Sequence, residues 1–271
     1  VVDQPEAMAY VVGHQLQSWG VPPDAVFDAA RANLAVLAGK SLDDSWSGGR
    51  TLITMVDDGD AYFASLLLVP GWLAGVADQM GGPVLAFVPD NNHVLICPLP
   101  DGDLEPLYRM VENHFTEAAR ALSPVGYVSA ADGRVVPYNP PPGHPHHAVT
   151  RRANAVLAAT EYTTQTEWLS GQYAENGIDL HVGALLAVAP ADGGPAQTIA
   201  TWTDGVATLL PAADTVAFVR PDTGMEFRAP WPVVAEHAGL TPEPLLSPAR
   251  YRVATWPPAE VLAELRRHAL D

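Results

Sequence analysis

The chain has 271 residues, of which 48% are hydrophobic, and its formal net charge is −17. That hydrophobic content can fill a core, and the length suits two modest domains or one large one. The acidic excess argues against binding to nucleic acid or anionic lipid, because both interactions need clustered Lys and Arg. It serves either solubility or attraction to a basic protein partner.

The apolar segments are too short for a membrane span. The longest, Phe63 to Trp72, is broken by Pro70-Gly71 and falls far short of the roughly 20 residues that cross a bilayer. Asp3 and Glu6 stand where a secretory signal would carry basic residues, so no export segment is expected. We therefore expect a cytoplasmic protein.

Cys97 is the one cysteine, which excludes an intramolecular disulfide and any multi-cysteine zinc or iron–sulfur site. It lies in the apolar run Val94–Pro98, so we expect a buried core residue. The alternative is a reactive nucleophile.

The first half of the chain predicts helices followed by short strands. Helical spacing, β-branched runs and turn residues mark these elements. In chain order they are a helix over 4–19 ending at Gly20, a helix from Pro23 to Leu37 ended by Gly39, a strand over 51–56 before the turn 57–60, a helical stretch over 61–80 broken at 70–71, a hairpin of 84–88 and 93–97, a helix over 104–122, and a hairpin of 126–130 and 134–138.

The proline-rich segment 139–145 cannot continue a helix or a central strand. We place a domain boundary there, giving domains 1–140 and 141–271. The second domain is expected to contain a helix over 147–171, strands over 180–189, 197–203, 206–210 and 215–219, a helix over 231–239, a strand over 250–255 and a helix over 257–269.

The two halves share short segments in the same order. Residues 31–33 are echoed by 152–154, and 85–90 by 216–222. The fold class expected is therefore α+β, with two related helix-plus-sheet modules, mostly antiparallel strands and a degenerate tandem repeat. Chance similarity is the alternative.

The first half also shares the order and spacing of its turns and core segments with a known family. The segments concerned are 30–34, 58–59, 64–65, Gly82 with 84–89, 94–95, Phe115, 132–133 and Pro137. Through them residues 22–138 resemble the YtpQ-like family of bacterial proteins, a domain of unknown function. The resemblance implies a cytosolic α+β domain and supplies no activity for any residue.

Catalytic signatures are weak throughout the sequence. There is no Gly-x-Ser-x-Gly elbow, and His93 and His114 have no evident orienting partner. The loop histidines 144, 146 and 147 are expected to be solvated, with a metal site as the alternative, and the aspartates of 57–60 and 101–103 suit turns. We expect no cofactor and no metal.

The stretch from Thr160 to Gln172 is unusual for a helix because it is rich in hydroxyl and amide side chains, which compete for backbone hydrogen bonds. One interpretation is a helix whose polar groups pair inside the protein. The other is a partner-binding surface, whose residues would be Glu161, Thr163, Thr164, Gln165, Glu167, Trp168 and Gln172.

These observations predict a non-catalytic cytosolic binding or adaptor protein that acts by protein–protein contact. An immunity-type neutraliser of a basic partner is one form of that function. The alternatives are a hydrolase-type enzyme with a site between the modules, using Asp58, Asp60 or His114 with Glu161 or Glu167, and a structural subunit of a homo-oligomer.

Overall fold

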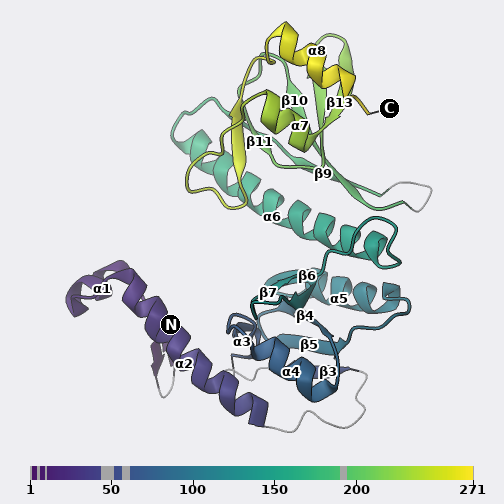
Figure 1. The fold of residues 1–271 in the computed structure, drawn as a ribbon. Coiled ribbons are helices and arrows are strands. Elements are labelled where there is room, and N and C mark those ends of the chain that lie inside the picture. Colours follow the sequence, from purple (N-terminus) through teal and green to yellow (C-terminus); the bar gives the residue numbers. More distant parts are fainter. Residues whose placement is uncertain are drawn as a thin grey trace. The chain divides into compact units, whose positions relative to one another are not determined.

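The computed structural model describes residues 2–4, 7–9, 11–43, 52–56, 62–189 and 194–270. The chain forms two compact units. The first comprises 1–100, 118–122 and 126–138, and the second comprises 101–117, 123–125 and 139–271. Figure 1 shows the elements of each unit in chain order. Among the described helices, none is both long and apolar enough to cross a membrane.

The N-terminal region corrects the prediction of a helix over 4–19. Strands β1 (Val2–Gln4) and β2 (Ala7–Ala9) pair antiparallel, and α1 spans only Gly13–Trp19. The side chain of Gln15 turns back and accepts a hydrogen bond from the Val12 backbone amide at 2.9 Å, which satisfies one of the free amides at the helix start. Gly20 ends the helix in a left-handed conformation, as predicted.

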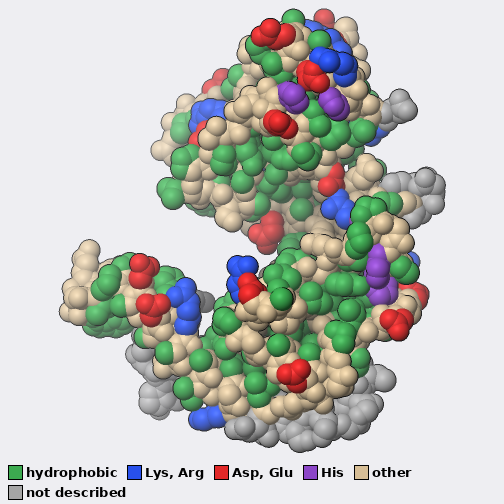
Figure 2. Space-filling view, viewed as in Figure 1, with side chains coloured by type: hydrophobic (Ala, Val, Ile, Leu, Met, Phe, Trp, Pro, Cys, Tyr) green, Lys and Arg blue, Asp and Glu red, His purple; other side chains and the backbone are tan. Residues whose placement is uncertain are grey.

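Helix α2 (Pro23–Asp43) continues six residues past the predicted end at Leu37. Gly39 does not end it, because the following turn is held by tertiary contacts. Ser41 accepts a hydrogen bond from the Trp72 indole at 2.8 Å, and Leu42 packs against the first core. The N-terminal half of α2 is exposed. Figure 2 shows hydrophobic, acidic and basic side chains side by side on this helix, and Phe27 and Val36 are among its exposed apolar residues.

Five strands form one sheet in the order β3-β5-β4-β6-β7. Their bounds are β3 Ile53–Val56, β4 Val84–Asp90, β5 His93–Pro98, β6 Ala121–Ser129 and β7 Val135–Pro137. The two predicted hairpins and the strand before residue 57 are confirmed. The predicted turn 57–60 lies outside the described residues.

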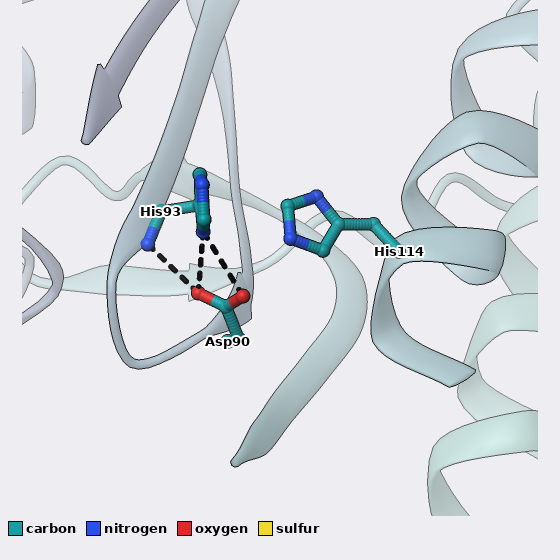
Figure 3. A group of neighbouring side chains, drawn as sticks. All are labelled: Asp90, His93 and His114. Atoms are coloured by element: carbon teal, nitrogen blue, oxygen red, sulfur yellow. Dashed lines mark hydrogen bonds and ion pairs between the residues drawn. The ribbon is translucent and has the colours of Figure 1, made fainter. Parts of the chain in front are cut away.

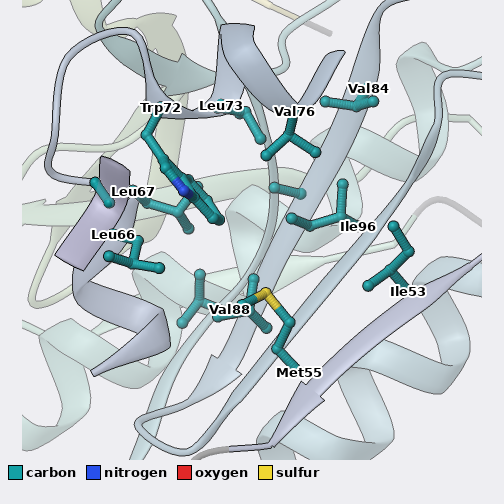
Figure 4. Close-up of a cluster of buried hydrophobic side chains, with 13 residues drawn as sticks. Ile53, Met55, Leu66, Leu67, Trp72, Leu73, Val76, Val84, Val88 and Ile96 are labelled. Carbon is teal, nitrogen blue, oxygen red and sulfur yellow. The ribbon is translucent and has the colours of Figure 1, made fainter. Parts of the chain in front are cut away.

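Helices α3 (Phe63–Leu66) and α4 (Trp72–Met80) confirm the helical stretch with its break at 70–71. Their apolar side chains meet those of the sheet in the first core (Figure 4), where Trp72, Leu73 and Val76 of α4 are fully buried. Every residue of β4 is buried, in agreement with the apolar run of residues 84–88.

Helix α5 (Glu105–Glu117) ends five residues before the predicted end at 122. The chain turns into β6 at Ala121, because Ser123 precedes Pro124 and a residue before proline is disfavoured in helical conformation. The Arg120 carbonyl instead accepts a hydrogen bond from the Asn91 amide at 3.3 Å. Strand pairing thus replaces the last helical turn.

The second unit contains a mixed sheet and a smaller one. The mixed sheet has the order β13-β12-β10-β9, in which β10 and β12 are parallel. The smaller sheet has the order β14-β11-β8. The strands are β8 His181–Val182, β9 Leu185–Val188, β10 Gln197–Thr203, β11 Thr208–Pro211, β12 Thr215–Arg220, β13 Gly224–Pro230 and β14 Arg250–Val253. Besides α5, the helices of this unit are α6 His147–Glu175, α7 Trp231–His237 and α8 Ala259–Arg267.

Strand β13 is absent from the sequence-based prediction. Its polar residues, including Glu226 and Arg228, hide the strand pattern, whereas Phe227 alone contributes a large side chain to the core. The Phe227 ring stacks on Phe218 of β12 with centroids 4.5 Å apart. Pairing with a buried neighbouring strand therefore decides its conformation.

The α+β fold class is confirmed, with eight helices and four sheets among the described residues. The echoed segments fall on elements of the same kind, since residues 31–33 and 152–154 are helical and 85–88 and 216–219 are strand. The tandem repeat and the boundary at residue 140 stay predictions.

Candidate functional site

Helix α6 carries the residues predicted to form a binding surface. It begins at His147, directly after a turn that includes Pro145, and runs to Glu175, four residues beyond the predicted end. The turn is fixed by His146, whose side chain is buried and whose Nε2 lies 2.7 Å from the Gly102 carbonyl oxygen. That oxygen can only accept, so Nε2 carries the proton. The expectation of a solvated histidine is wrong at this position.

One side of α6 is held by a buried arginine. Arg250 of β14 is 0% exposed, and its guanidinium donates hydrogen bonds to Gln165 Oε1, Thr166 Oγ1 and the Tyr162 carbonyl oxygen. Two further hydrogen bonds reach the carbonyls of Gly183 and Leu209. These polar groups on the inner side of α6 are thereby paired inside the second unit.

The opposite side of α6 is exposed. Six of the seven predicted residues lie there: Glu161, Thr163, Thr164, Glu167, Trp168 and Gln172. Gln165 is half-buried, donates to the Pro248 carbonyl at 2.8 Å and binds Arg250. The structure therefore brings six of the seven together on one surface and places the seventh on the inner side.

A helical spacing aligns part of this surface into a stripe. Glu161, Thr164, Trp168, Gln172 and Glu175 follow one another at intervals of three or four residues, which places them on one side of the helix. We call these five residues the α6 stripe. Trp168 in its centre is 62% exposed. The segment 160–175 contains three Glu and no Lys or Arg, so the stripe is acidic around an aromatic centre.

A groove of about 650 Å³ borders the other end of α6. Its lining comes from residues of the second unit: Asn139, Pro140, His147, Thr150, Arg151, Asn154, Ala155, Leu157, Ala158, Glu161, Tyr162, Thr198, Asp214 and Pro248. Glu161 belongs both to the groove and to the α6 stripe.

Two charged groups of the groove lining, Arg151 and Asp214, are bound to each other. Arg151 Nη2 donates to Asp214 Oδ2 at 2.5 Å, and the same oxygen accepts from the Thr198 amide at 2.8 Å and its hydroxyl at 2.9 Å. The Thr198 hydroxyl also accepts from the Asp214 amide. A catalytic nucleophile needs a nearby base that is available to take its proton. Asp214 Oδ2 already accepts hydrogen bonds from Arg151 and Thr198, so we interpret this cluster as a structural one.

Tyr162 also lines the groove, and its side chain is buried. Its hydroxyl donates to the Ala249 carbonyl at 2.7 Å and accepts from the Ala212 amide at 3.1 Å. Burial raises the pKa of this phenol, which keeps it neutral. Both hydrogen-bonding functions of the hydroxyl are in use, so it is a structural group.

Asp90 and His93 form a second pair of ligand-capable side chains, at the turn between β4 and β5 (Figure 3). Asp90 Oδ1 accepts from the backbone amides of Asn92 and His93, both at 2.8 Å, and lies 2.9 Å from His93 Nδ1. Each of these two side chains offers one ligand atom to a metal ion. His114, also drawn in Figure 3, belongs to the second unit. The backbone hydrogen bonds of Asp90 form the turn, and its contact with Nδ1 orients the His93 ring, which corrects the expectation that His93 has no orienting partner.

Cys97 is buried, as predicted, and burial raises the pKa of its thiol to about 11. A thiol with so high a pKa is a poor nucleophile at neutral pH. Of the carboxylates named for the enzyme alternative, Asp58 and Asp60 lie outside the described residues.

Sequence reasoning missed Arg151, Thr198 and Asp214. They come from α6, from β10 and from the residue before β12, and no spacing along the chain signals their approach. Arg250, which orders α6, was also missed, because a single arginine at the start of a strand resembles any surface charge.

No family model, curated protein or solved structure was found to match this chain. The resemblance of residues 22–138 to the YtpQ-like family therefore stays a prediction.

Proposed function

We propose that this is a non-catalytic cytoplasmic binding protein that contacts a basic protein partner through the α6 stripe. The observation that carries the proposal is the exposure of Trp168, 62%, in the centre of an ordered acidic helix surface. Tryptophan dominates the binding energy of many protein interfaces because it buries a large rigid ring. Neutralisation of a basic partner, as in immunity-type proteins, is one form of this function.

The division of α6 into two sides supports a binding role for the exposed one. The inner side contributes Tyr162, Gln165 and Thr166 to the Arg250 network, which holds the helix in place. The outer side thus presents its side chains from a fixed backbone. A preorganised surface loses less conformational entropy on binding, which favours affinity.

The charge distribution indicates the chemistry of the partner. Glu161, Glu167 and Glu175 surround Trp168, and the chain as a whole carries −17. An arginine of a partner could stack on the indole and pair with a neighbouring carboxylate. The net charge would also speed the encounter with a cationic protein.

Affinity capture from the native cell tests this proposal. The immobilised protein and its Trp168→Ala variant are compared at about 50 and 300 mM salt, with Met225→Ala as matched control because Met225 is 61% exposed in the same unit. We expect a basic protein to be retained by wild type and control, and at least about tenfold less by Trp168→Ala.

The proposal fails if Trp168→Ala retains the same proteins as the wild type, or if the association rate of the purified complex does not change with salt. Light scattering of the isolated protein distinguishes the homo-oligomer alternative. In that case Trp168→Ala would change the mass of the protein itself.

A further inference from the structure

The groove and the α6 stripe form one continuous path along the helix. His147, Arg151, Asn154, Ala158 and Glu161 line the groove at intervals of three or four residues, and the stripe continues from Glu161 to Glu175 with the same spacing. A partner bound to the stripe is therefore beside the groove mouth, where Glu161 stands.

We propose that the groove receives an extended segment of the basic partner, with an Arg or Lys side chain paired to Glu161 and an apolar side chain against Ala158 and Pro248. This inference rests on the function proposed above. The volume of about 650 Å³ lies in the range of sites that bind small ligands or a few side chains.

The charges of the groove favour a cationic segment over an anionic one. Arg151 is the arginine in the lining, and its guanidinium is bound to Asp214 at 2.5 Å, so its charge is already balanced. Glu161 is exposed, and Glu167 lies on the next turn of the same helix. An acidic segment would meet repulsion at the mouth without a free cation inside.

The apolar part of the lining suits a side chain with a hydrocarbon portion. Ala155 is a buried residue of the lining, and Ala158, Pro140 and Pro248 contribute further carbon surface. Another part of the lining is fixed by the hydrogen bonds of Asp214 with Arg151 and Thr198. The groove therefore exists before binding, and a ligand need not order it.

A second copy of this chain is a poor occupant. Two molecules that each carry −17 repel one another, and the stripe presents further carboxylates at the contact. Self-association of the protein through the groove would contradict the inference.

Titration with three blocked tripeptides, followed by NMR of the backbone amides, tests the inference on the full chain. The probes are acetyl-Leu-Arg-Leu-amide and its Gln and Glu analogues. We expect the Arg peptide to shift the amide signals of residues 147–162 and to bind roughly threefold more tightly than the Gln peptide, as for a partly exposed ion pair. The Glu peptide should bind most weakly.

Two variants probe the groove itself. Ala158→Phe fills it and should abolish the shifts caused by the Arg peptide, and Glu161→Arg, an exposed change that does not threaten folding, should reverse the preference towards the Glu peptide. Met225→Ala, away from the groove lining, is the control and should bind as the wild type does.

Equal dissociation constants for the three peptides, no shifts in residues 147–162, or an unchanged preference in Glu161→Arg would overturn the inference. These results would leave the proposed function standing if Trp168→Ala still loses the captured partner. Retention of that partner by Trp168→Ala would instead refute the proposed function.

Discussion

The carbon atom at the centre of the Arg250 guanidinium lies 5.0 Å from the centre of the Tyr162 ring, and Arg250 Nη2 donates to the Tyr162 carbonyl oxygen at 3.1 Å. The five oxygen atoms that accept hydrogen bonds from this guanidinium are all uncharged. Burial lowers its pKa, and dipoles of the surrounding groups compensate the charge. One side chain thereby joins β14 to α6.

Replacement of this arginine should be costly. Arg250→Met leaves several buried oxygen atoms without a donor, and we expect it to lower the free energy of unfolding by about 3–5 kcal/mol in urea titrations. Arg252→Met, which removes an exposed pair with Glu243, should cost less than about 1 kcal/mol. Equal losses of unfolding free energy in the two variants would show that Arg250 stabilises the protein no more than an exposed arginine does.

A close backbone approach in the first unit favours glycine at position 133. Its φ is +80°, its carbonyl accepts from the Gly71 amide at 2.8 Å, and an added Cβ would lie 3.1 Å from the Gly71 nitrogen. Gly133→Ala should therefore destabilise the protein by about 1–3 kcal/mol in chemical denaturation. Gly82→Ala, where a Cβ meets open space, should change stability by less than about 1 kcal/mol. A neutral Gly133→Ala would contradict the close approach.

Cys97 should make stability fall at alkaline pH. Its thiol is neutral in the folded protein up to a pKa of about 11, whereas the unfolded thiol ionises near 9.0. Its contribution is therefore complete below pH 9 and is lost as the pH rises towards 11, up to roughly 3 kcal/mol. We expect the decline in urea-derived stability to be smaller in Cys97→Ala. Ellman's reagent should react with the wild type only after unfolding, and rapid reaction of the native protein would refute the buried thiol.

The ion pairs of Arg152 with Glu105 and Glu112 should be weakened in acid, which lowers the stability of the protein. Arg152 donates to Glu112 at 3.0 Å and to Glu105 at 2.6 Å. Burial favours a higher pKa for Glu105, but hydrogen bonds from Arg109 and Arg152, with their charges, hold the pKa below its ordinary value of 4.5. This stability is present above pH 4.5 and is lost as the pH falls through the lowered pKa.

Unfolding in urea at pH 7 and pH 3 measures that effect. We expect Arg152→Met to lose about 1 kcal/mol less than the wild type between the two conditions, because its carboxylates no longer have this partner. The same loss in both proteins would show that the pairing does not contribute to acid sensitivity.

The sequence alone determined the elements whose signals are local. Gly20 ends α1 because it adopts a left-handed conformation with little strain, and the apolar runs at 84–88 and 93–97 form the hairpin that their turn residues predict. The composition of 160–172 left open whether its polar side chains pair inside the protein or form a surface, and only the structure places Glu161, Thr164 and Trp168 in solvent.

Tertiary structure decided what depends on residues far apart in the chain. Packing of Leu42 carries α2 past Gly39, pairing with β12 makes a strand of the polar segment 224–230, and Arg250 draws Gln165 to the inner side of α6. The groove wall joins Arg151 to Asp214, 63 residues apart. Local propensities differ by a fraction of a kcal/mol per residue, so buried contacts that no short window of sequence contains can override them.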